Sequence, residues 1–90
     1  MAYSYGSVTV TTAATLIVPA NPNRKSVTVV NSSDATLMYI GPDSSITTAN
    51  AQPLYENQTR DQEHISETWQ GDIYGIVGSG TADARYWEVD

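Results

Sequence analysis

The sequence predicts an all-β fold: a single small antiparallel β-sandwich, or a jelly-roll-like barrel, of seven to eight short strands. Three observations support this prediction. Thr, Val, Tyr and Trp recur while Phe is absent, and these residues suit a pleated, half-buried surface better than a helix. Apolar and polar residues alternate with a period of two in several segments, and turn signals recur roughly every 8–12 residues. Ninety residues suffice for one domain with one thin core.

Two short strands are predicted in the first twenty residues. Residues 7–12 alternate valine with serine and threonine, which is the period of a half-buried strand. Residues 15–18 form a second strand that Pro19 ends, because proline cannot donate to a ladder of hydrogen bonds. We expect residues 1–6 to be a flexible N-terminal arm, which leaves residues 7–90 as the β-sandwich domain.

A strand-turn-strand unit follows near the middle of the chain. Residues 24–31 and 35–41 are rich in β-formers and flank the polar residues 32–34. The second strand carries four large residues in a row, from Leu37 to Ile40, which indicates burial on both faces. We therefore expect this unit to be a hairpin at the centre of the sandwich.

The second half of the chain is predicted to contain the remaining strands. We expect a short strand near residues 45–48, a contact at residues 53–55 and a less regular strand around Ile65. Residues 72–77 form a strand, and residues 82–89 form another in which polar and apolar residues alternate again.

A glycine-rich stretch, Gly75 to Gly80, joins these last two strands. It lacks the lysine and the following helix of a phosphate-binding loop, so we expect a hairpin turn at Gly78-Ser79-Gly80 instead. Gly75 itself is expected to allow another chain segment to approach closely.

Charge and composition exclude several functions. Ten acidic residues against four basic ones give a formal net charge of −6, and such a field repels phosphate, so we expect no nucleic-acid partner. No apolar run approaches the length of a membrane span, and the first residues lack the features of a signal peptide. We expect no membrane partner and synthesis in the cytoplasm. Cysteine is absent, which excludes disulfides and thiol nucleophiles.

No residue pattern indicates catalysis. His64 has Glu63 and Glu67 nearby in the sequence, but in a strand these glutamates point away from the histidine. The aspartates fit no calcium-binding loop. We therefore expect no enzyme, no metal and no cofactor.

Four aromatic residues are candidates for an interaction surface, because they lie outside the clearest strands or at their ends: Tyr3, Tyr5, Tyr55 and Trp69. Exposed aromatic rings anchor protein interfaces or stack on sugars. Tyr3 and Tyr5 are the more notable pair, because they belong to the expected arm.

Several phrases along the chain also match a known pattern. They are Ala20-Asn21-Pro22-Asn23-Arg24-Lys25-Ser26, Tyr39-Ile40-Gly41, Ser44-Ser45-Ile46-Thr47-Thr48 and the segment from Ile73 through Trp87 to Val89. In these phrases and their order, the chain resembles a family of small β-structured bacteriophage virion proteins over residues 8–89. Residues 56–67 depart from the family pattern, being more acidic and polar.

The resemblance implies a structural role in the virion. Related domains serve as capsid decoration (cement) proteins or as modules of fibres and spikes. The favoured expectation is a decoration protein that binds the major capsid protein on the outside of the head and bridges its subunits. Because capsid pseudo-threefold positions suit trimers, we expect a homotrimer.

Two alternatives remain open at this point. The first is a carbohydrate- or receptor-binding module of a fibre or spike, with a glycan bound by Tyr55, Trp69 and the loop of residues 44–60. The second is a head-tail completion or tail component, for which rings of copies are expected.

Overall fold

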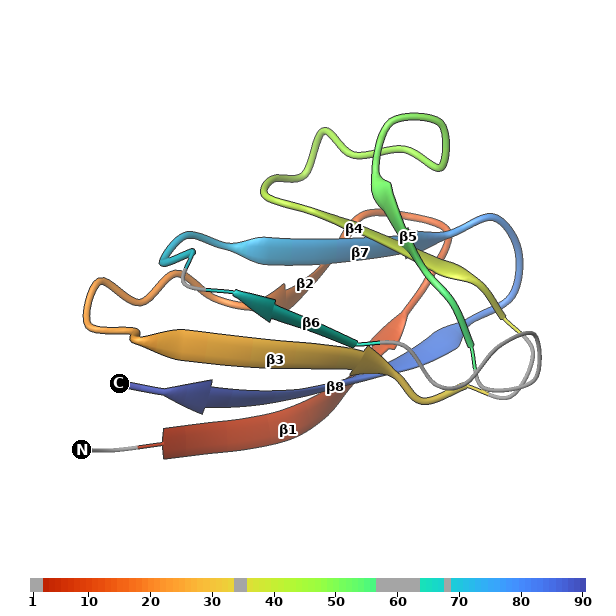
Figure 1. Ribbon diagram of the computed structural model, residues 1–90. Coiled ribbons are helices and arrows are strands. Elements are labelled where there is room, and N and C mark those ends of the chain that lie inside the picture. Colours follow the sequence, from red (N-terminus) through yellow and green to blue (C-terminus); the bar gives the residue numbers. More distant parts are fainter. Residues whose placement is uncertain (1–2, 34–35, 57–63, 68) are drawn as a thin grey trace.

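In the computed structural model of the chain, the described residues form eight antiparallel strands in two four-stranded sheets that pack face to face (Figure 1). The structure describes residues 3–33, 36–56, 64–67 and 69–90, with the backbone alone at 64–67. The strands are β1 (Tyr3–Val10), β2 (Thr15–Val18), β3 (Ser26–Asn31), β4 (Met38–Gly41), β5 (Gln52–Leu54), β6 (His64–Glu67), β7 (Ile73–Val77) and β8 (Ala82–Val89). The described residues contain no helix, and the predicted all-β sandwich is confirmed.

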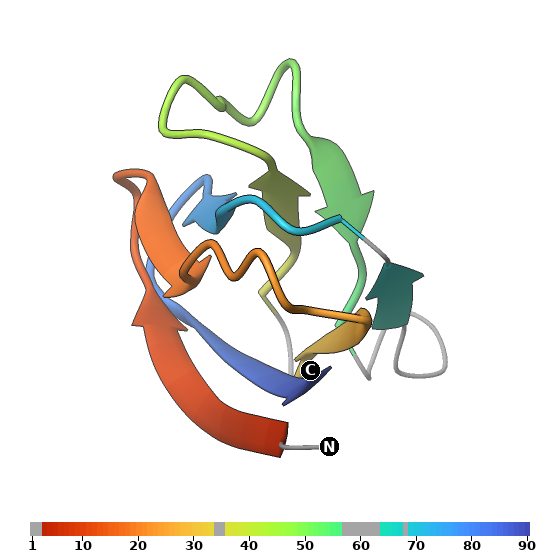
Figure 2. The same ribbon diagram turned by 90° about the vertical axis from the view of Figure 1, so that its left-hand side faces the viewer.

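The strand order is that of a jelly roll. Sheet A has the order β1-β8-β3-β6, and sheet B has the order β2-β7-β4-β5. Antiparallel ladders join β1 to β8, β2 to β7, β3 to β6 and β4 to β5. This set of pairs describes one long hairpin that is wound around itself, with the β4–β5 connection at its tip. Figure 2, a view along the strands, shows the two layers that result.

The core lies between the inner faces of the two sheets. Its members are aliphatic and nearly inaccessible to solvent: Val10, Ile17, Val18, Val27, Val29, Met38, Ile40, Leu54, Ile73, Val77, Ala82 and Ala84, with Tyr86 packed at its margin. Gly75 leaves room for neighbouring core side chains, because a Cβ there would lie 2.8 Å from the Cδ1 atom of Ile17 on β2 and 3.3 Å from the Cγ atoms of Val10 on β1. The close approach expected at Gly75 is confirmed.

The expected central hairpin is wrong. Strand β3 belongs to sheet A and β4 to sheet B, so the chain crosses between layers after Asn31. The Asn31 side chain is fully buried, and its Nδ2 donates to the carbonyls of Thr36 at 2.8 Å and Leu54 at 2.9 Å. This amide therefore joins a carbonyl group of the crossover to a carbonyl group of β5 and satisfies both with a buried donor.

The turn at residues 78–80 also crosses between sheets, from β7 to β8, so the predicted hairpin there is wrong as well. Gly80 has a φ of 70°, the left-handed conformation that glycine adopts without steric cost. The short strand expected near residues 45–48 is absent, and these residues form an irregular connection between two turns. The contact expected at residues 53–55 corresponds largely to β5.

The described part of the expected arm is not an arm. Residues 3–6 form the first half of β1 and pair with β8, Tyr3 opposite Val89 and Tyr5 opposite Trp87. Ser4 and Gly6 give this segment weak strand character by itself, but a long partner strand supplies the hydrogen bonds that fix it.

Candidate interaction surface

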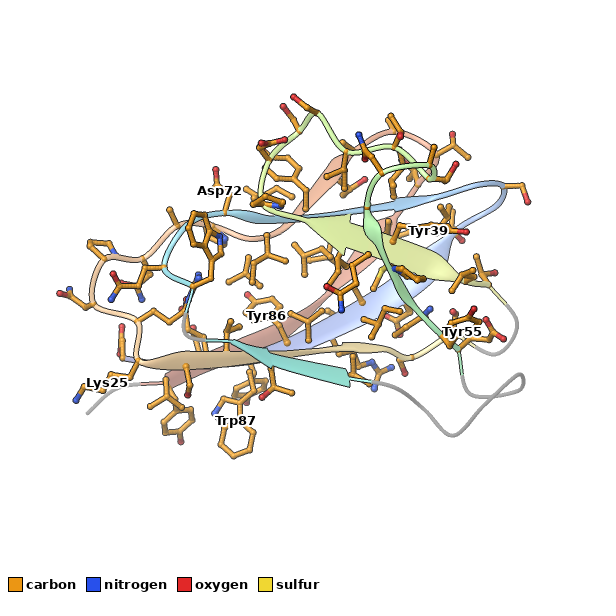
Figure 3. The ribbon with its side chains drawn as sticks, turned by 45° about the horizontal axis from the view of Figure 1, so that its top comes forward. Lys25, Tyr39, Tyr55, Asp72, Tyr86 and Trp87 are labelled. Carbon is orange, nitrogen blue, oxygen red and sulfur yellow. The ribbon has the colours of Figure 1, made fainter. Side chains whose placement is uncertain are left out.

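Three exposed aromatic side chains lie on the outer face of sheet A. Strand β1 contributes Tyr3 and Tyr5, which are 68% and 75% exposed, and strand β8 contributes Trp87, which is 61% exposed. Tyr5 and Trp87 are direct partners in the ladder, and residues two apart in a strand share a face, so all three rings stand together. Figure 3 shows Trp87 directed away from the sandwich. Tyr3, Tyr5 and Trp87 are called the aromatic face below.

The surroundings of the aromatic face carry little net charge. Strand β1 contains no charged residue. Further along β8, the exposed side chains of Arg85 and Asp83 form an ion pair, with Nη2 and Oδ2 3.0 Å apart. Thr28 lies beside Trp87 on the neighbouring strand β3. Such a surface is easily dehydrated, because few charges must be removed from water.

A buried ion pair supports this face from inside the sandwich. Glu88 follows Trp87 in β8 and points inward, where its Oε2 accepts a hydrogen bond from Arg24 Nε at 2.6 Å. Its other oxygen, Oε1, accepts one from the hydroxyl of Ser4 at 3.0 Å. Since Ser4 lies between the two tyrosines, one carboxylate ties together both strands that carry the aromatic face.

The remaining contacts of Arg24 fix two loops to the same point. The arginine side chain is fully buried, and its Nη1 donates to the carbonyls of Trp69 at 2.6 Å and Gly71 at 3.0 Å. Its Nη2 donates to the carbonyl of Pro19 at 2.7 Å. A buried guanidinium with one carboxylate and three carbonyl partners is well compensated, so this end of the sandwich is rigidly organised.

Trp69 and Tyr55 lie apart from the aromatic face. Trp69 is 49% exposed, but its indole Nε1 donates to the carbonyl of Asp72 at 2.9 Å, and its ring occupies the space that a side chain at Gly71 would need. The ring therefore caps its own loop. Tyr55 is half-buried and follows β5, and Figure 3 places it at the end of the sandwich opposite Lys25, the residue next to Arg24.

The structure thus unites two of the four predicted residues and adds one. Tyr3 and Tyr5 share a face, whereas Tyr55 and Trp69 belong elsewhere. Trp87 was not among the candidates, although the alternation of residues 82–89 grouped it with Asp83 and Arg85 on the polar side of its strand. That grouping was the signal that Trp87 faces solvent.

The described residues offer no catalytic arrangement. They contain no cluster of three or more histidine, aspartate or glutamate side chains able to hold a metal ion. A shallow groove of about 240 Å³ between Thr36, Leu37, Tyr39, Gly78 and Ser79 has no acid-base pair in its lining. The side chain of His64, with residues 57–63, lies outside the part that the structure describes.

Comparisons with known proteins give no relative from which a function could be inferred. No family model, no curated protein and no solved structure matches this chain. Within the described residues, no helix has the length and apolar character needed to cross a membrane. The aromatic face is therefore the feature from which a function is argued.

Proposed function

We propose that this chain is a structural virion protein that decorates the outer surface of a bacteriophage head and bridges subunits of the major capsid protein. The observation that carries the proposal is the aromatic face, three exposed rings held on a stiff platform. The resemblance to small phage virion proteins supplies the virion as the setting, and self-association is part of the proposal.

The size of the aromatic face suits the centre of a protein interface. A tyrosine or tryptophan buries about 150–250 Å² when fully covered, so covering the exposed parts of these three rings removes about 400 Å² from water. A standard protein interface buries about 800 Å² on each partner. The rings would form about half of such a contact, and tyrosine and tryptophan are the residues that dominate binding energy at interface centres.

The fold is compatible with this proposal but does not decide it. Jelly rolls build viral capsid domains, and they also build lectins. Fold-level likeness is an analogy, and function has to be argued from a site. Here the site is flat, aromatic and nearly uncharged, which favours a protein surface over a substrate cleft.

A head-binding experiment tests the proposal. Phage heads that lack this protein are mixed with purified wild type or with Trp87→Ala, and bound protein is measured by co-sedimentation. Loss of a central aromatic anchor is expected to weaken binding about 30-fold or more. Leu16→Ala is the matched control, because Leu16 is an exposed apolar residue, 40% accessible, on the other sheet, and it should bind as wild type does.

Two results would contradict the proposal. Wild-type protein that does not bind such heads rules out decoration. Binding that is equal for wild type and Trp87→Ala, with both folded by circular dichroism, removes the aromatic face from the contact.

The rival function, glycan binding, has a separate readout. The rival was based on Tyr55 and Trp69, which the structure does not bring together. A glycan array probed with wild type and Trp69→Ala distinguishes the two: reproducible hits that depend on Trp69 favour the fibre or spike module, and a blank array with intact head binding favours decoration.

A further inference from the structure

We propose that two copies of this chain pair through their β1 strands, antiparallel, and join their A sheets into one continuous eight-stranded sheet. This inference concerns self-association and does not depend on what the aromatic face binds. It rests on the edges of the two sheets, on the direction of the free backbone groups in β1, and on the residue sizes along that strand.

The β1 edge lacks the protection that the other three edges show. Strands β5 and β6 have only three and four residues, and β5 contains Pro53. Strand β2 has four residues and an irregular register between Leu16 and Val18. Strand β1 has eight residues, no proline, no charge and an uninterrupted register with β8. Short length, proline and bulges are the usual devices that prevent edge pairing, and β1 has none of them.

Two hydrogen bonds show which groups of β8 face β3. The carbonyl of Val89 accepts from the Lys25 amide at 2.7 Å, and the carbonyl of Asp83 accepts from the Ser32 amide at 2.7 Å. In an antiparallel ladder both backbone groups of a residue point to the same side, and the side alternates along the strand. The odd-numbered residues of β8 therefore face β3, and the even-numbered residues face β1.

The same alternation fixes the free groups of β1. The partners of the even-numbered β8 residues are Ser4, Gly6, Val8 and Val10, so these four residues bond to β8. The N–H and C=O groups of Tyr3, Tyr5, Ser7 and Thr9 then point to the open edge. No hydrogen bond joins these groups to another described segment.

One register uses all four outward-pointing residues in both copies. It pairs Tyr3 with Thr9 of the partner subunit and Tyr5 with the partner's Ser7, with the twofold axis at Gly6. Each tyrosine ring then lies beside a small hydroxyl side chain, as cross-strand packing requires. Gly6 meets its symmetry copy in the close, non-hydrogen-bonded position, where the absence of a side chain removes any clash.

The buried area predicts a weak dimer. The seven paired residues, at about 3.4 Å each in a sheet about 10 Å thick, bury about 500 Å² in total at the strand edge. Covering the seam sides of four tyrosine rings adds about 600 Å². The sum is about 1,100 Å², close to the lower limit of ~1,200 Å² for a specific interface. We therefore expect association in the micromolar range.

The net charge makes the association dependent on salt. Each copy carries a formal charge of −6, so two copies repel each other at long range although the β1 edge itself is neutral. Salt screens this repulsion. The dimer should therefore strengthen as ionic strength rises, the opposite of what an interface built from ion pairs would show.

A matched pair of substitutions at Ser7 tests the pairing. Sedimentation equilibrium of the wild-type chain between about 1 µM and 1 mM is expected to show a monomer–dimer equilibrium. Ser7→Pro deletes an outward N–H that β8 does not use, so the fold is retained while association falls about tenfold or more. Ser7→Ala keeps the N–H and loses only the hydroxyl, so it should associate within about threefold of wild type.

Amide hydrogen exchange gives a second readout on the unmodified protein. Amides of Tyr3, Tyr5 and Ser7 should gain protection as concentration rises, whereas Ser4 and Gly6 should be protected at every concentration. Three results would overturn the proposal. The wild-type chain could stay monomeric throughout the concentration range, it could form a trimer such as the resemblance implies, or a folded Ser7→Pro variant could dimerise like wild type. The proposal would also be overturned if amide exchange at Tyr3, Tyr5 and Ser7 did not change with concentration. This measurement uses the wild-type chain, so it remains decisive even if Ser7→Pro fails to fold.

Discussion

The outer faces of the two sheets differ in what covers them, although both carry aromatic residues. On sheet B, residues 42–51 fold over the sheet, and Ile46 is buried against Gly41, where a Cβ would overlap the isoleucine side chain. Tyr39 and Tyr74, on that face, are half-buried. On sheet A, no described segment lies over the sheet, and Tyr3, Tyr5 and Trp87 are exposed.

The comparison shows that strand composition alone does not decide which face is available. Both faces have tyrosine at outward positions, and one connection makes the difference. The β4–β5 connection is long enough to return an isoleucine to the sheet, whereas sheet A receives no such cover among the described residues. Substitutions in the support, in the cover and in the aromatic face itself test this contrast.

Arg24→Met should destabilise the support of the aromatic face. The substitution leaves the buried carboxylate of Glu88 without its cationic partner, and breaking a buried pair in this way costs about 3–5 kcal/mol of unfolding free energy. Urea denaturation measures the loss, and hydrogen exchange should accelerate in β1 and β8 more than in β4 and β7. Arg85→Met is the control, because its ion pair is exposed, and it should change stability by less than about 0.5 kcal/mol. A loss below about 1 kcal/mol for Arg24→Met would show that the pair does not support the face.

Ile46→Ala should make sheet B resemble sheet A. Removing a buried isoleucine side chain costs about 2–3 kcal/mol by loss of packing, and it uncovers the tyrosines on that sheet. We expect a lower denaturation midpoint and increased binding of a fluorescent hydrophobic dye. Ser45→Ala, at an exposed neighbouring position, should change neither. If the midpoint falls without extra dye binding, the loop does not act as a cover.

The pair Tyr5 and Trp87 should contribute a small coupling to stability. The two residues are direct partners in the ladder, and aromatic cross-strand pairs contribute about 0.5–1 kcal/mol. A double-mutant cycle with Tyr5→Ala and Trp87→Ala measures this term by thermal or urea unfolding. Each single substitution should leave the protein folded, since both rings are mainly exposed. A coupling of zero would mean that the two rings do not touch and that each contributes to the aromatic face independently.

Local patterns in the sequence predicted which residues of a strand face inward. In β3, Val27 and Val29 are buried and Thr28 is not, and in β8 the residues expected on opposite faces are separated as expected. These predictions succeed because burial imposes a period of two on any half-buried strand. The absence of a helix among the described residues follows from the same patterns.

Strand pairing could not be predicted in this way. Among the described strands, only β4 and β5 are neighbours both in the sequence and in a sheet, whereas residues 32–34 and 78–80 look like hairpin turns in the sequence. A crossover between sheets depends on partner strands that are distant in the sequence. The main local feature of this crossover is the buried Asn31, which looks in the sequence like an ordinary turn asparagine.

The candidate surface was predicted in part. The exposure of Tyr3 and Tyr5 was expected, but on an arm and not on a strand. The ion pair that supports them joins Arg24 to a glutamate 64 residues away, a separation at which no local pattern carries information. The position of Trp87 beside Tyr5 could not be predicted, because it depends on the pairing of β8 with β1. That pairing follows from the jelly-roll topology and not from any local pattern.

The ladder between β1 and β8 has a consequence for how this protein is made. Tyr3 lies opposite Val89, so all the residues between these two strands must leave the ribosome before β1 can find its partner. Topologies dominated by such distant pairs fold in about milliseconds to seconds, whereas helical domains can form while they are still being synthesised. Until β8 arrives, β1 is unpaired along both sides, and the new chain is then most exposed to aggregation. This domain therefore cannot complete sheet A until β8, the last of its strands to be synthesised, reaches β1, the first.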